Sequence, residues 1–207
     1  MSMYQKQLVI FSALLLLIPG IGHIAHADAG YPTDSELVML PAYCKARLRN
    51  VSEAEKKRWK DAFGYKVWSG IHHYCQKLNQ LNRAKVEINP EVRDKYYREA
   101  YSGFKVQAEA YGPTFKLRHE AYYYAGTIAP RLGLIGEGIA LQEKAISIKP
   151  GYTRAYMALG DLYYDNGQLD EAMKVVERGL KQAPKSKGLK RRKEKFTKKL
   201  DKSQTNP

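Results

Sequence analysis

Cysteine pairs, metal-binding spacings and alternating apolar patterns are scarce in this chain. Its 207 residues include two cysteines and no Cys-x-x-Cys pair, which excludes the usual zinc pattern and a c-type haem attachment. No stretch alternates apolar and polar residues with a period of two, so no β-sheet is expected. No Gly-x-Ser-x-Gly elbow and no paired carboxylates suited to catalysis are visible. We therefore predict no enzyme and no bound cofactor.

The one long apolar run lies near the N-terminus. Residues 8–18 form it, with Lys6 before them and Pro19 and Gly20 after them. Ala25-His26-Ala27 then supplies the small-x-small pattern of a signal-peptidase site. A membrane span needs roughly 20 apolar residues, so we predict a cleaved secretory signal over residues 1–27. The protein would then be exported, periplasmic or secreted, with no membrane span in its mature form. An uncleaved membrane anchor is the alternative.

Acidic residues are in deficit, and the excess of basic residues lies near the C-terminus. The chain has 35 Lys and Arg against 21 Asp and Glu, a formal net charge of +14. Residues 181–207 hold 11 basic and 2 acidic residues. We predict that this segment binds an anionic envelope polymer, a lipid surface or an acidic protein, and not nucleic acid. A solvated cap without a ligand is the alternative. The densest cluster comprises Lys190, Arg191, Arg192, Lys193 and Lys195.

Small and aromatic residues recur with a period of 34 residues in the second half of the chain. Pro150 and Pro184 are 34 residues apart and align residues 119–152 with residues 153–186. In the second unit the recurring places are Tyr156, Leu159, Gly160, Tyr163, Gly167, Ala172, Val176 and Leu180. In the first unit they are Tyr122, Ala125, Gly126, Ala129, Gly133, Gly138 and Ala145.

This pattern resembles the tetratricopeptide repeat family, in which each repeat is a helix-turn-helix pair. The resemblance implies an all-α fold, a right-handed superhelix of stacked helix pairs. Three residues depart from the family pattern. Gly138 and Gly179 replace its usual alanines, and Gln142 replaces a large apolar residue. We therefore expect the first unit to pack loosely.

The remaining segments are expected to extend the superhelix at both ends. Residues 28–67 are predicted to be an N-terminal helical extension, in which Ser52 and Glu55 form a capping box. Residues 68–118 are predicted to form a degenerate helix pair, because repeats need neighbours to bury their faces. Residues 119–186 are the two repeats. Residues 187–207 are predicted to be a basic capping helix and tail with an apolar seam of Leu189, Phe196 and Leu200.

The resemblance also implies a binding groove. In the family, the second, fifth, ninth and twelfth places of each repeat face a ligand. A mixed aromatic and charged set at these places suits an extended peptide or a partner helix. Asp161 stands where an Asn would be needed to clamp a C-terminal carboxylate, which argues against that mode. These places hold Glu120, Tyr123 and Thr127 in the first repeat, and Arg154, Met157, Asp161 and Tyr164 in the second.

The leading functional hypothesis is an exported, non-enzymatic scaffold or adaptor that helps to assemble a cell-envelope complex through this groove. A groove that is merely solvated is the alternative at those positions. A second functional hypothesis is that the protein binds an anionic envelope polymer through its basic tail. The two would differ in their dependence on salt, since polymer binding weakens sharply as ionic strength rises.

The two cysteines are predicted to form a disulfide. An even number of cysteines in an exported chain favours a bond between Cys44 and Cys75. Two buried thiols are the alternative. His72 and His73 lie close to Cys75 in the sequence, which leaves open a redox or metal-binding protein that uses these four residues. We assign no metal site, because His73 points away from the helix face that His72 and Cys75 share.

Overall fold

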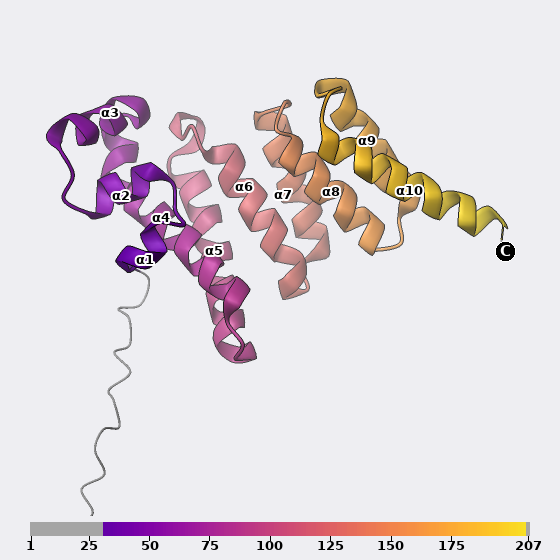
Figure 1. Cartoon of the computed structure of the whole chain (residues 1–207), viewed down its shortest axis with the longest axis horizontal. Helices are drawn as coiled ribbons and strands as arrows, with labels where there is room; N and C mark the ends of the chain where they lie inside the picture. Colours follow the sequence, from indigo (N-terminus) through magenta and orange to yellow (C-terminus); the bar gives the residue numbers. More distant parts are fainter. Residues whose placement is uncertain (1–30, 206–207) are drawn as a thin grey trace, which may run out of the picture.

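The computed structural model describes residues 31–205, so the predicted signal over residues 1–27 lies outside the described part. Within that part there are ten α-helices, two short 3-10 helices and no strand. Figure 1 shows the helices following one another along the long axis of the molecule. In chain order they are α1 (Asp34–Leu37), α2 (Ala42–Leu48), α3 (Glu53–Phe63), α4 (Tyr65–Val86), α5 (Pro90–Ala110), η1 (Gly112–Thr114), α6 (Arg118–Ile128), η2 (Ala129–Leu132), α7 (Ile135–Ile148), α8 (Thr153–Asp165), α9 (Leu169–Gln182) and α10 (Lys187–Thr205).

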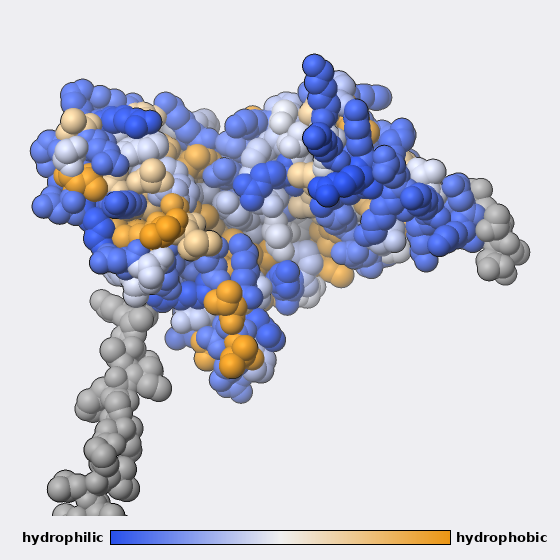
Figure 2. All heavy atoms as spheres, in the orientation of Figure 1, coloured by the Kyte–Doolittle hydropathy of each residue, from blue (hydrophilic) through white to orange (hydrophobic). Residues whose placement is uncertain are grey.

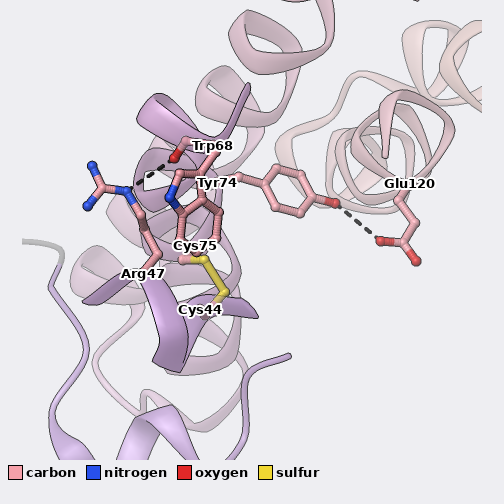
Figure 3. The surroundings of a disulfide bond; sticks show 6 residues. All are labelled: Cys44, Arg47, Trp68, Tyr74, Cys75 and Glu120. Atoms are coloured by element: carbon pink, nitrogen blue, oxygen red, sulfur yellow. Dashed lines mark hydrogen bonds between the residues drawn. A yellow bond between two sulfur atoms is a disulfide. The ribbon is translucent and has the colours of Figure 1, made fainter. Parts of the chain in front are cut away.

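Helices α1 to α3 are attached to α4 by one covalent link and one ionic link. Cys44 of α2 and Cys75 of α4 form a disulfide, with the sulfurs 2.06 Å apart and both residues fully buried (Figure 3). Glu36 of α1 pairs with Arg83 of α4, whose Nη2 lies 2.9 Å from Oε2 of the carboxylate. The same carboxylate accepts the backbone N–H of Thr33 at 2.8 Å, which caps α1.

A single glycine separates α3 from α4. Gly64 has φ +78°, a left-handed conformation that favours glycine, and its N–H donates to the carbonyl of Lys60 at the end of α3. Its own carbonyl accepts the N–H of Trp68 at 2.9 Å and so begins α4. Helix α4 therefore starts at Tyr65, and the predicted boundary between residues 67 and 68 falls inside its first turn.

Helices α4 and α5 form an antiparallel pair whose core contains an aromatic contact. Asn89 caps α5 through its side chain, and Pro90 occupies the first turn. The rings of Tyr74 and Phe104 meet edge to face with centroids 5.4 Å apart. These helices have 22 and 21 residues, whereas the four that follow have 11 to 14. The pair consequently projects beyond its neighbours in Figure 1.

Two helix pairs, α6 with α7 and α8 with α9, follow in the places of the two predicted repeats. Each pair turns at a glycine with positive φ, Gly133 at +78° and Gly167 at +76°. Pro130 ends α6 early, and the 3-10 helix η2 completes the first arm of that pair.

The first repeat is closely packed, so the expectation of loose packing is wrong. A Cβ atom on Gly126 would lie 2.8 Å from Nε2 of Gln142, and one on Gly138 would lie 3.1 Å from Cγ of Pro130. Gln142 is buried and donates to the carbonyl of Tyr123 at 3.1 Å. The proline ring and the glutamine amide therefore occupy the space that the family's alanine and apolar residue would fill.

Helix α10 covers the last helix pair. Leu189 and Phe196 are fully buried against α8 and α9, while most lysines and arginines of α10 are exposed. Figure 2 shows this end of the molecule as an almost uniformly hydrophilic surface. Over residues 31–205, no helix is both long enough and apolar enough to cross a bilayer.

Candidate functional site: a groove between the repeat helices

A hollow of about 540 Å³, here called the central hollow, opens between α6, α8 and α10. It brings together five of the seven residues predicted to face a ligand. No feature of the sequence marked Arg131 of η2 or Gln142 of α7 as a site residue. The lining comprises Tyr123, Gly126, Thr127, Pro130, Arg131, Gln142, Arg154, Met157, Ala158, Asp161, Leu162, Asp165 and Arg192.

One wall of the central hollow carries an arginine held on aromatic rings. The guanidinium of Arg154 lies 4.7 Å from the ring centroid of Tyr123 and 5.6 Å from that of Tyr124. Tyr152 supports Tyr123 edge-on, with centroids 5.5 Å apart. Among the described residues, no carboxylate forms an ion pair with Arg154. The tyrosine rings thus orient Arg154, and no ion pair with a described residue neutralises its charge.

The lining of the central hollow also includes a charge pair that links α8 to α10. Arg192 donates to both oxygens of Asp161, from Nε at 2.8 Å and from Nη2 at 2.6 Å. Because this pair is neutral, the other charges of the hollow are Arg131, Arg154 and Asp165. Arg131 lies over the ring of Tyr97 at 5.4 Å. The hollow therefore favours an acidic group in whatever binds there.

Tyr164 lies outside the central hollow because α10 covers it. Its ring stacks on Phe196, with centroids 4.8 Å apart and planes 14° apart. The ammonium of Lys195 sits 3.9 Å from the centroid of the Tyr164 ring. Counting positions within one repeat could not reveal these contacts, because Phe196 and Lys195 belong to α10, which lies outside the repeat.

Glu120 also lies outside the central hollow and faces α4. The hydroxyl of Tyr74 donates to its Oε2 at 3.5 Å, a long contact that Figure 3 shows beside the disulfide. Burial raises the pKa of Glu120, although the positive charges of Arg154 and Lys149 oppose the rise. Its side chain consequently contributes to the contact between α4 and α6 and not to the opening.

The predicted basic cluster is divided among different sides of α10. Arg192 pairs with Asp161, and Lys193 pairs with Glu177 at 2.8 Å. Arg191 and Lys195 border a second hollow on the outer side of the helix, and Lys190 lies on another side. The anion-binding role of the five residues stays a prediction.

The Cys and His residues are not arranged as a metal site. Both cysteines are used by the disulfide, so neither thiolate is available as a ligand. The rings of His72 and His73 lie 3.9 Å apart, and burial lowers the pKa of His72. In the part of the chain that the structure describes, no three His, Cys, Asp or Glu residues converge so as to hold a metal ion.

Comparisons with known proteins agree with this architecture. Residues 133–191 match a family described as Tetratricopeptide repeat. Hsp70-Hsp90 organizing protein 3 of Arabidopsis thaliana is 26% identical over 125 residues, which cover 54% of this chain and 22% of that protein. The matched region therefore covers well under two thirds of the length of that relative.

A solved structure shares the fold. A thermophilic tetratricopeptide repeat protein of Thermus thermophilus superposes with a TM-score of 0.55 at 21% identity, over 70% of each chain. The Sgt2 tetratricopeptide repeat domain of Aspergillus fumigatus gives a TM-score of 0.49 at 16% identity, covering 63% of this chain and 83% of that one. The predicted fold class, an all-α right-handed superhelix of helix pairs, is confirmed. The family match covers α7, α8, α9 and the start of α10, so this part of the chain is similar to tetratricopeptide repeats.

Proposed function

We propose that this protein is a non-enzymatic adaptor that binds a segment of a partner protein in the central hollow. The observation that carries this proposal is that Arg154, which lies on a tyrosine ring, lines the same hollow as the apolar residues Met157, Ala158 and Leu162. A partner segment with an acidic side chain and a neighbouring apolar side chain would satisfy both. The Arabidopsis relative is named as an organizing protein, which supports the adaptor class.

Site-specific photo-crosslinking tests this proposal. A benzoylphenylalanine at Thr127, which is exposed on the rim of the hollow, should form an adduct with a partner protein in source cells. The same group at Lys185, in the loop between α9 and α10, should not. Adding Arg154→Glu should abolish the adduct, whereas Lys185→Glu makes the same charge reversal away from the hollow and should preserve it. Equal adducts from both positions would count against the proposal.

We further propose that the adaptor works after export. The support is the sequence of residues 1–27, with its short apolar run and its Ala25-His26-Ala27 site. A disulfide between Cys44 and Cys75 suits an oxidising compartment. N-terminal sequencing of the protein from source cells should find a chain that starts at Asp28. A protein that retains residues 1–27 and stays in the cytosolic fraction would refute this part while leaving the adaptor proposal intact.

A further inference from the structure

The second hollow, here called the cap hollow, is a distinct charged surface. It has a volume of about 420 Å³ and lies between α8 and the outer side of α10. Apart from Tyr164, every residue that lines it is charged, and Glu194 is the one carboxylate among them. The basic residues of its lining are Arg191, Lys195, Lys198, Lys199 and Lys202.

The cations of α10 fall into two groups that differ in what they contact. Arg192 and Lys193 are neutralised by carboxylates of α8 and α9. No ion pair joins Arg191, Lys195, Lys198 or Lys199 to any residue within the described range. Ion pairing therefore neutralises two of the five cations in the cluster predicted from sequence. The fold places Lys198 and Lys199 beside the unpaired Arg191 and Lys195 in the cap hollow.

The unpaired cations form a stripe along one side of the helix. Arg191, Lys195 and Lys198 follow one another at steps of four and three residues, which places them on one helix face. With a rise of about 1.5 Å per residue, they stand roughly 5 Å apart along the axis. Tyr164 fixes the middle one, since the Lys195 ammonium lies 3.9 Å from its ring centroid. A repeating chain of anions could meet several of these charges at once.

From this arrangement we infer that the cap hollow binds an acidic polysaccharide. The Tyr164 ring stacks on Phe196, and the Lys195 ammonium lies 3.9 Å from the ring centroid, so a nucleic acid base would have to compete with these side chains to stack on it. On α10, Leu189 and Phe196 are buried and Leu200 is half-buried, so the described part of the helix exposes no large apolar side chain to insert into lipid or to anchor a protein helix. A linear polymer of sugars with carboxylate groups needs only the cations and the open hollow.

Two matched variants of the full chain test this inference. The stripe variant replaces Arg191, Lys195, Lys198 and Lys199 by Gln, and the control variant replaces Lys66, Lys95, Lys181 and Lys185 by Gln. Both lose four positive charges from exposed positions, so their net charges are equal. Circular dichroism should show the same helix content in both variants, because the buried seam of α10 is unchanged.

Binding is measured by titration with polygalacturonate at low and high salt. The parent and the control should bind within about twofold of each other, and the stripe variant should bind at least about tenfold more weakly. Parent binding should fall steeply as salt rises. Equal losses in both variants, or no binding by the parent at low salt, would overturn the inference. Tighter stripe-dependent binding of a thymidine oligonucleotide or of phosphatidylglycerol vesicles would also overturn it, since the ligand would then be of another class.

Discussion

Single atoms decide how closely the helices of each repeat approach. At Gly179 an added Cβ would lie 2.9 Å from both Cβ and Cγ of Tyr156 and 3.0 Å from Cδ1 of Leu189. The Cβ of Tyr156 is bonded to the backbone of α8, so it can move away only if the helix moves. Glycine at this place is therefore a packing requirement, even though the family pattern has alanine there.

Replacing Gly179 by the alanine of the family pattern should destabilise the protein. Gly179→Ala should lower the free energy of unfolding by about 1–3 kcal/mol, although alanine is intrinsically the better helix former by about 1 kcal/mol. Gly136→Ala is the control, because nothing lies within 4 Å of its added Cβ in α7. That variant should be unchanged or slightly more stable. Chemical denaturation of the two variants measures the difference, and a Gly179→Ala protein as stable as the Gly136→Ala protein would contradict this account.

Among the connections between elements, the Glu36–Arg83 ion pair makes stability depend on pH. The hydrogen bond from Arg83, with the cap contacts of Thr33, lowers the pKa of Glu36 from 4.5 to about 2. A carboxyl whose pKa is lower in the folded state stabilises that state when ionised. The stabilisation is complete above pH 4.5 and is lost as the pH falls toward 2.

Removing this charge should loosen α1 from α4 at neutral pH. Glu36→Gln retains a cap acceptor and should lower stability by about 1–2 kcal/mol at pH 7, after allowance for partial exposure to solvent. The difference from the parent should shrink below pH 4.5. Glu53→Gln is the matched control, since its carboxylate pairs with Lys56 on the surface and is 88% exposed. Thermal unfolding at several pH values measures both, and a difference that persisted at pH 2 would rule out the ion pair as its cause.

On the scale of the whole molecule, contacts run mainly between successive helices. Pairs such as α4 with α5, α6 with α7 and α8 with α9 dominate the packing, and no extensive contact joins α1–α3 to α8–α10. A superhelix built in this way transmits a local loss of stability only to neighbouring elements. The disulfide offers a test, because it lies at one end.

Replacing both cysteines should destabilise one end and spare the other. The bond closes a loop with a sequence separation of 31, for which chain-entropy arguments give about 3–4 kcal/mol. In the Cys44→Ala, Cys75→Ala variant, amide hydrogen exchange should accelerate in α1–α4 and stay unchanged in α8–α10. Reduction of the parent protein should reproduce the same pattern. Faster exchange throughout the chain would show that the molecule unfolds as one unit.

Much of the architecture could be predicted because its signals are local. The turn glycines Gly133 and Gly167 and the cap at Asn89 each act within one or two turns of helix, and the 34-residue spacing of Pro150 and Pro184 marks where such a unit repeats. Such signals are present in the sequence itself, so the helix pairs could be predicted, and five of the seven predicted groove residues lie together in the central hollow. The start of α4 was missed, because one glycine both ends α3 and begins α4.

The character of the surfaces was decided only by tertiary structure. From the sequence alone, Asp161 was a groove residue and Arg192 an anion-binding residue, but the fold brings them together as one ion pair. Tyr164 was expected to belong to the groove, yet it stacks on Phe196 and borders the cap hollow instead. These contacts join residues about 30 positions apart on different helices, and the composition of neither helix determines them. The sequence thus determined which helices form and in what order, while the packing of α10 on α8 decided which charges remain available for binding.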